Sequence, residues 1–244
     1  MTRRLAALFA GLNIVGILLP LFGDEASKRP VEVLHTERVN FVSGGTIQVL
    51  HSFGSLSVEG WDRPEVEVTV VKSRERYYEP KHREQAVHAL ERVRIVAERH
   101  SDRELTISTI LPHHRFPRSL FGKSGVIVEY RIHVPRDSNL AIHHGTGRVL
   151  VSSVTGNIDA TSRSGDILLM LPDSGAYSID ARSKLGTVSS DFPGDSHRRY
   201  LVGSGFARAT PPPSRRIQVR TRMGGITIKA APVEADGPVV VRNR

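Results

Sequence analysis

Hydrophobic and polar residues alternate along most of the chain beyond residue 30. Short runs with this two-residue period fill the stretch from Val31 to Val71, with apolar positions at Val31/Val33, Val39/Phe41, Ile47/Val49, Leu56/Val58 and Val66/Val68/Val70. Because successive side chains of a β-strand point to opposite faces, these runs predict strands with one buried and one solvated face. Gly45, Gly54 and Gly60 separate the runs and predict turns. The pattern is typical of an all-β domain.

Longer elements occupy the middle of the chain. The segment Lys81–Arg92 has an apolar stripe at helical spacing and follows a proline suited to a first turn, so it predicts one inserted amphipathic helix. Val93–Glu98 and Glu104–Ile110 then predict a hairpin of two strands. Gly125–Val134 is the clearest long strand. Its expected buried face consists of Val126, Val128, Tyr130, Ile132 and Val134.

A glycine repeat begins after Pro135. Gly147, Gly156 and Gly165 are nine residues apart, and each precedes one polar and then one hydrophobic residue. Glycine adopts positive φ without steric cost, so it can turn the chain sharply between short strands. A short strand cannot bury enough apolar surface alone, so the copies must stack. The repeat predicts a β-solenoid or prism-like stack, and an antiparallel β-sandwich is the alternative. The expected interior positions are Val149, Ile158 and Ile167; looser copies start at Gly45, Gly54, Gly175, Gly186 and Gly225.

A series of segments along the chain has a recognisable order. The segments are Gly54–Asp62, the predicted helix up to Leu90, Leu105–Thr109, Val128–Pro135, Leu140–Val151, Val154–Gly156 and Ser164–Ile167. In this order they resemble the bacterial putative adhesin family, a domain of unknown function with glycine-rich β-strand repeats. The match covers roughly residues 40 to 230. The resemblance implies an exported or membrane-anchored, β-solenoid-like domain, and it carries no catalytic residues over to this chain.

The first 26 residues predict a targeting segment. Arg3 and Arg4 precede an uncharged, mostly apolar stretch from Leu5 to Gly23, and Asp24 follows it. This order is typical of a secretory signal peptide, and the stretch is close to the ~20 residues that span a bilayer. A cleaved signal peptide and a retained membrane anchor both fit the pattern. In either case we expect the β-repeat domain, residues 31–244, to be exported to the periplasm, cell envelope or extracellular face.

Composition indicates which partners the domain could have. The net charge is +9, and Lys and Arg are interleaved with Asp and Glu rather than gathered in one run. A basic balance favours anionic partners. We therefore expect an anionic envelope polymer or a protein as partner, and the membrane through the N-terminal segment if that segment is retained. Nucleic acid is not expected, because export removes access to it. The loop Pro112–Lys123 mixes basic and aromatic residues and could contact an anionic surface.

Residues that could carry chemistry do not form a recognised site. The chain has no cysteine, which excludes disulfides and thiolate ligands. The glycine repeat lacks the Asp-rich pattern of calcium-binding β-rolls. Other candidates are the carboxylates Asp159, Asp166 and Asp180, the pairs His113-His114 and His143-His144, and Gly203-Ser204-Gly205. Adjacent residues of a strand point to opposite faces, so a histidine pair chelates one ion poorly. We expect no catalytic residue, metal or cofactor.

Three functions are compatible with this reading. The first is a non-catalytic surface or scaffold module, adhesin-like, that binds envelope polymers or proteins. The second is a membrane-anchored accessory of an envelope-stress regulator. The third is a carbohydrate-active enzyme built on a β-helix, which would require a carboxylate cluster on one face.

Overall fold

Strands make up most of the part of the chain that the structure describes. The computed structural model describes residues 31–74, 84, 87–88, 90–110, 126–173, 175–199, 202–212 and 214–231. Its strands are β1 (Val31–Asn40), β2 (Thr46–Ser52), β3 (Ser55–Trp61), β4 (Glu65–Arg74), β5 (Arg94–Ser101), β6 (Glu104–Ile110), β7 (Val126–Pro135), β8 (Asn139–Thr146), β9 (Val149–Ser152), β10 (Ile158–Ser164), β11 (Ile167–Pro172), β12 (Tyr177–Leu185), β13 (Val188–Ser190), β14 (Asp195–Arg199), β15 (Gly203–Arg208), β16 (Arg215–Met223) and β17 (Ile226–Ala231).

The strands form two sheets that enclose a common interior. Sheet A has eight strands in the order β1-β4-β7-β3-β9-β11-β17-β13, and sheet B has nine in the order β14-β15-β12-β16-β10-β8-β2-β6-β5. The central strands of both sheets pair in parallel. Consecutive parallel strands such as β8 and β9, or β10 and β11, lie in different sheets, so each pair forms one coil. This is a β-solenoid, and the alternative of an antiparallel sandwich is excluded.

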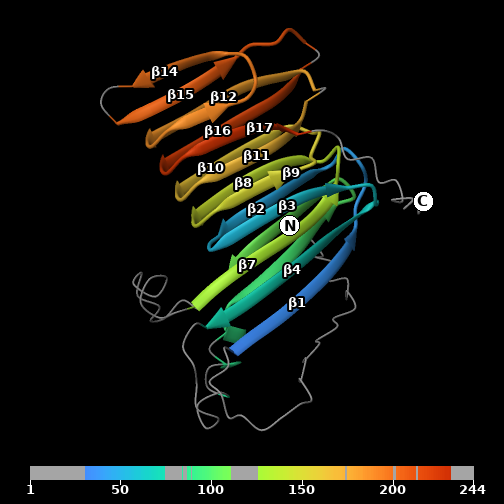
Figure 1. Ribbon diagram of the computed structural model, residues 1–244. Helices are drawn as coiled ribbons and strands as arrows, with labels where there is room; N and C mark the ends of the chain where they lie inside the picture. The colour runs from blue at the N-terminus through green and yellow to red at the C-terminus, as the bar shows by residue number, and fades with distance from the viewer. Residues whose placement is uncertain are drawn as a thin grey trace, which may run out of the picture.

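The coils do not stack in the order of the sequence. In space they follow one another as β6–β7, β2–β3, β8–β9, β10–β11, β16–β17 and β12–β13. Figure 1 shows β16, in red, lying between β10 and β12 in one elongated stack. The last coil of the described chain is therefore intercalated between two coils that precede it in the sequence.

Antiparallel strands close both ends of the parallel stack. At one end β1 pairs with β4 and β4 with β7, while β5 pairs with β6 in the other sheet. At the opposite end β15 pairs with β12 and β14 with β15. A stack of repeats needs such terminal elements, because an open last coil would expose apolar surface and unpaired backbone.

The predicted interior residues fill the space between the sheets. Val149, Ile158 and Ile167 are each 1% exposed. Ile158 pairs with Leu140 on one side and with Ile217 on the other, so equivalent side chains of successive coils lie above one another. All described side chains of the predicted buried face of β7, from Val128 to Val134, are also buried. The predicted hairpin is confirmed as β5 and β6.

One corner of the solenoid is a ladder of glycines. Gly54, Gly147, Gly165, Gly224 and Gly186 occupy it in spatial order, and all have positive φ. A Cβ on Gly165 would lie 1.9 Å from the carbonyl oxygen of Gly147, and one on Gly224 would lie 2.2 Å from that of Gly165. Real Cβ atoms do not approach oxygen so closely, so any side chain would push the coils apart. The corner therefore needs glycine for its dihedral angles and for its closeness to the next coil.

The structure shows how the nine-residue spacing relates to the coils. Asn139, the first residue of β8, and Asn157, which directly precedes β10, are hydrogen-bonded and 18 residues apart, so a full coil contains two glycine periods. Gly156 lies at the opposite turn, where a Cβ would meet the carbonyl oxygen of Ser138 at 2.0 Å. Gly175 belongs to neither series and has no positive φ. The periodicity predicted the turns correctly but not that alternate turns belong to different corners.

Two predicted elements lie largely outside the described residues. Most of the predicted helix at 81–92 is one of them, although its residues Val87, His88 and Leu90 are helical and Leu90 is buried. The targeting segment, residues 1–26, is the other. No described helix is long and apolar enough to cross a membrane.

The glycine ladder makes a direct prediction for stability. We expect Gly224→Ala to lower the free energy of unfolding by at least about 2 kcal/mol, because it combines backbone strain with a clash against the next coil. Gly225→Ala is the matched control, since its Cβ would meet Asp166 Oδ1 at an ordinary 3.5 Å without positive φ. We expect it to change stability by less than about 1 kcal/mol. Urea unfolding of both variants checks this, and equal effects would contradict the corner constraint.

Candidate functional site

The outer face of sheet B carries a concentration of positive charge on its C-terminal coils. Strands β10, β16 and β12 lie side by side there, and their odd and even positions alternate between interior and solvent. The outward charged residues of these strands are the basic Arg163, Arg182, Lys184, Arg216, Arg220 and Arg222 and the acidic Asp159 and Asp180. We call the six basic residues the basic face. Three adjacent strands therefore present six positive charges against two negative ones.

Part of this charge is balanced within the face. Asp180 forms ion pairs with Arg182 at 2.9 Å and with Arg220 at 3.2 Å, so one carboxylate pairs with two guanidinium groups. Arg163, Lys184 and Arg222 are all exposed, and none of them forms an ion pair with another described residue. We call these three residues the basic row. Their charge faces solvent without a carboxylate partner from the described part of the chain.

The residues of the basic row occupy equivalent positions in three stacked coils. Arg222 lies between Thr221 and Met223, which pair with Ser162 and Ser164 on either side of Arg163. The same two residues of β16 pair on the other side with Ser183 and Leu185, which flank Lys184. Neighbouring strands are about 4.8 Å apart, and like charges on adjacent strands destabilise a sheet. The row thus costs stability, and an anionic partner would recover it.

Exposed apolar side chains lie at the ends of β16 and β12 and on the segment that follows β14. Met223 and Leu185 pair with each other, and the Gly186 N–H donates to the carbonyl of Val202 at 3.1 Å. These side chains are 50%, 45% and 63% exposed for Met223, Leu185 and Val202 respectively. We call the three the rim. It lies next to the glycine corner, where the chain leaves sheet B for sheet A.

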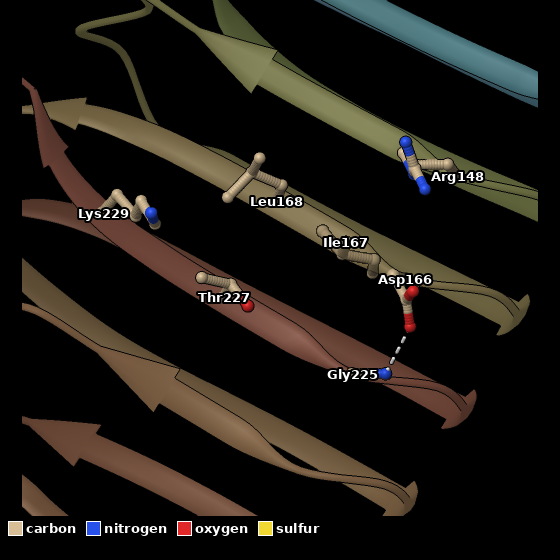
Figure 2. A pocket seen from close by; sticks show the side chains of 7 residues that line it. All are labelled: Arg148, Asp166, Ile167, Leu168, Gly225, Thr227 and Lys229. Atoms are coloured by element: carbon tan, nitrogen blue, oxygen red, sulfur yellow. Dashed lines mark hydrogen bonds between the residues drawn. The ribbon is translucent and has the colours of Figure 1, made fainter.

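A depression of about 280 Å³ lies on the opposite side, over β11 and β17 of sheet A. Figure 2 shows that its charged residues, Arg148, Asp166 and Lys229, surround Leu168 and Thr227. Asp166 Oδ1 accepts a hydrogen bond of 2.8 Å from the backbone N–H of Gly225. This carboxylate therefore joins the corner of one coil to that of the next, which is a structural role.

A second polar cluster covers the outer face of sheet A near β3 and β7. The Trp61 and His133 rings are stacked with centroids 5.0 Å apart, and the guanidinium of Arg63 lies 4.9 Å from the centre of the Trp61 ring. His133 lies between two carboxylates, 3.7 Å from Glu59 and 3.5 Å from Glu67. The cluster contains both acidic and basic groups close together, so it has less unbalanced charge than the basic row.

The carboxylates considered from the sequence do not come together. Gln218 of β16 pairs with both Asp159 and Asp180 and so separates them, and Asp166 lies at the glycine corner. Ser204 of the Gly203-Ser204-Gly205 segment is inside strand β15 and donates to the Gly186 carbonyl at 3.0 Å. It therefore does not lie at a strand-to-helix turn, which a nucleophile elbow would need.

The two histidines of the pair at 143 and 144 point to opposite sides of β8. His143 is exposed and its Nδ1 is 2.9 Å from Thr161 Oγ1. His144 is 5% exposed, and its Nδ1 is 2.8 Å from Ser52 Oγ. His113, His114 and the rest of the loop Pro112–Lys123 lie outside the described residues. Within the described part of the chain, no group of three possible metal ligands occurs.

Sequence reasoning did not identify the basic row. Its members are separated by 21 and 38 residues, since they stand at 163, 184 and 222. Only the intercalation of β16 brings them together, and interleaved charges along the chain gave no run to notice. The one usable signal was the alternation of Arg216, Gln218, Arg220 and Arg222 with buried residues, which marks a strongly basic strand face.

Burial lowers the pKa of His144 below its ordinary value of 6.5. In the unfolded chain His144 binds a proton as pH falls through about 6.5, whereas in the folded protein it binds one only at lower pH. The free energy of unfolding should therefore fall as pH drops below about 6.5. We expect His144→Gln to weaken this acid sensitivity in urea titrations at successive pH values. His143→Gln, on the exposed side of the same strand, controls for the substitution itself. An identical pH profile for His144→Gln and the unchanged protein would contradict the prediction.

A solved structure has a fold similar to that of this protein. The crystal structure of a putative cell adhesion protein from Clostridium sporogenes ATCC 15579 matches 83% of this chain and 100% of that chain, with 12% identity and a TM-score of 0.51. The crystal structure of a putative adhesin from Bacteroides fragilis NCTC 9343 matches 86% of this chain and 100% of that chain, with 12% identity and a TM-score of 0.25. This TM-score is too low to establish a shared fold. At such identity the first match shows a shared fold alone. No curated protein matches.

The family is shown by sequence. The model of a family described as Toastrack DUF4097 matches residues 91–229, which is more than half of the chain. The matched region runs from just before β5 into β17 and so includes five of the six coils. The resemblance to the bacterial putative adhesin family, a domain of unknown function, is thereby confirmed, and this protein belongs to the Toastrack DUF4097 family.

Proposed function

We propose that this protein is a non-catalytic, adhesin-like module of the cell envelope or cell surface that binds an anionic partner through the basic face. We expect that partner to carry closely spaced phosphate or carboxylate groups. The observation that carries the proposal is the basic row, where three like charges on adjacent strands face solvent without an acidic partner among the described residues.

Electrostatics favours binding over a purely solvated role for this face. Charges at the spacing of neighbouring strands repel one another, and a rigid sheet prevents the backbone from relaxing that repulsion. The fold does not require a basic residue at this position. In the adjacent coil, the position of β8 equivalent to Arg163 is Gly145. A multivalent anion could contact several of these cations at once. Because the sheet already holds them in place, binding would cost little conformational entropy.

A non-catalytic role is supported by the distribution of the carboxylates. Glycoside hydrolysis uses two carboxyl groups on either side of one bond. Here Asp180 is engaged with two arginines and Asp166 with a backbone amide. Asp159 remains as a single exposed carboxylate on its strand. The proposal therefore assigns the face to binding.

A surface or envelope location agrees with two observations. The N-terminal segment has the order of charges and apolar residues of an export signal or anchor. The crystal structure that shares the fold is that of a putative cell adhesion protein. Under this proposal the solenoid stands outside the cytoplasmic membrane, with the basic face accessible to anionic material of the envelope.

Binding of a soluble polyanion tests the proposal. We expect long-chain polyphosphate to bind the full chain with an affinity that falls steeply with salt, because counterions compete for the same charges. Arg163→Glu/Arg222→Glu should weaken this binding at least about tenfold. The control Arg148→Glu/Lys229→Glu makes the same change in net charge on the sheet A side.

Fluorescence anisotropy of labelled polyphosphate at several salt concentrations measures both variants. Equal losses in the two double variants would mean that net charge alone is responsible, and they would contradict a specific binding face. Unchanged binding in Arg163→Glu/Arg222→Glu would contradict it as well. Thermal unfolding of each variant verifies that the solenoid is intact.

A further inference from the structure

Charged residues on the outer face of sheet B are sorted into rows that cross the strands. Four residues before the members of the basic row on β10, β16 and β12, the outward positions are Asp159, Gln218 and Asp180, which pair in register. Asp195 continues this second row on β14, since both Asp180 and Asp195 pair with Ala207 of β15. We call Asp159, Asp180 and Asp195 the acidic row. The same face thus has a positive and a negative row that run parallel to each other.

The two rows are far enough apart to act independently on a bound anion. Four residues of a strand span about 13 Å at about 3.3 Å per residue. The Debye length at physiological ionic strength is about 8 Å, so the potential of the acidic row is largely screened at the basic row. Arg182 and Arg220, the outward cations between the rows, already form ion pairs with Asp180. An anion held on the basic row therefore meets three cations and lies beyond the screening distance of the acidic row.

These distances decide how a long anion can lie on the face. A chain that followed β16 would pass Gln218, which stands between Asp159 and Asp180 at the spacing of adjacent strands, about 4.8 Å. This spacing is shorter than the Debye length, so both carboxylates would repel the chain. A broad anionic surface, such as a bilayer, would cover both rows and would be repelled in the same way. A single chain that crosses the strands along the basic row avoids the acidic row.

The basic row is open towards β8. The position of β8 equivalent to Arg163 is Gly145, which has no side chain to obstruct a bound polymer that continues in this direction. On the side away from the acidic row, β10 ends in Ser164, and β16 and β12 end in Met223 and Leu185 of the rim, none of which is charged. A linear anion can therefore follow the row across three strands and onto a fourth.

We infer that the anionic partner is an extended single chain that crosses β10, β16 and β12 along the basic row, parallel to the long axis of the solenoid. Its phosphate or carboxylate groups contact Arg163, Arg222 and Lys184 in turn. This inference rests on the proposed function, because it gives the form and direction of the partner of the basic face. It distinguishes a linear polyanion from an anionic bilayer surface, which the acidic row disfavours.

Adding one cation at either of two positions in the full chain tests the direction. Gly145→Lys extends the basic row to β8, and Gln218→Lys inserts the same charge on β16 within the acidic row. Gly145→Ala is the steric control, because any Cβ at this position lies 3.3 Å from the Ser52 carbonyl oxygen. We expect Gly145→Lys to bind labelled polyphosphate at least about threefold more tightly than Gly145→Ala, with a steeper dependence on salt. Gln218→Lys should gain less than about twofold over the unchanged protein, since Asp159 and Asp180 on the adjacent strands would pair with the new lysine.

The outcomes separate this inference from the proposed function. An equal or greater gain in Gln218→Lys, or no gain in Gly145→Lys over Gly145→Ala, would overturn the direction of the partner. Either result would retain the basic face as long as Arg163→Glu/Arg222→Glu still weakens polyphosphate binding. If that double variant binds as tightly as the unchanged protein, both proposals fail. We expect the same order of affinities with poly-L-glutamate, a linear polycarboxylate, and a reversed order with either polymer would contradict the inferred direction.

Vesicles test the alternative of a bilayer partner. The full chain is mixed with phosphatidylcholine vesicles with and without phosphatidylglycerol, so that any contribution of the N-terminal segment is common to both. We expect the preference for anionic vesicles to fall equally in Arg163→Glu/Arg222→Glu and in the control Arg148→Glu/Lys229→Glu, because it depends on net charge alone. A preference that only the first double variant removes would assign the basic row to a bilayer and overturn the linear partner.

Discussion

The close approach of backbone at the glycine corner is the constraint on which the rest of this structure depends. Each glycine of the ladder lies so near the carbonyl of the coil before it that no side chain fits, and its positive φ turns the chain from sheet B into sheet A. Equal turns in successive coils keep the strands in register. Register then places apolar residues such as Leu140, Ile158 and Ile217 above one another in the interior.

Register also organises the surface, and this is how the fold produces a candidate site. A solenoid converts equivalent positions of different coils into rows, whatever their distance in the sequence. Because β16–β17 is intercalated, Arg222 lies between Arg163 and Lys184, and Met223 lies beside Leu185. A rigid two-sheet stack holds these groups in place without ordering them on binding. The chemistry of the face is therefore one of fixed charge.

The sequence predicted what depends on local patterns. Alternation identified the strands, including β7 with its buried face from Val128 to Val134, and the repeat identified stacked coils. It could not assign Gly156 to the opposite turn, since a period of nine residues fits one corner or two equally well. Nor could it place β16–β17, because strand pairing between coils depends on contacts far apart in the chain. The basic row follows from that placement, so it was hidden from the sequence as well.

The intercalation of the last coil is the central claim, and disulfide trapping tests it most directly. The chain has no cysteine of its own. Thr161 pairs with Arg220 across β10 and β16, and Arg182 pairs with Arg220 on the far side. Adjacent strands bring Cα atoms within disulfide range, and strands two apart do not. Mild oxidation should therefore link Thr161→Cys to Arg220→Cys within one chain and leave Thr161→Cys/Arg182→Cys reduced. A bond between 161 and 182 with none between 161 and 220 would contradict this stacking order and the binding face derived from it.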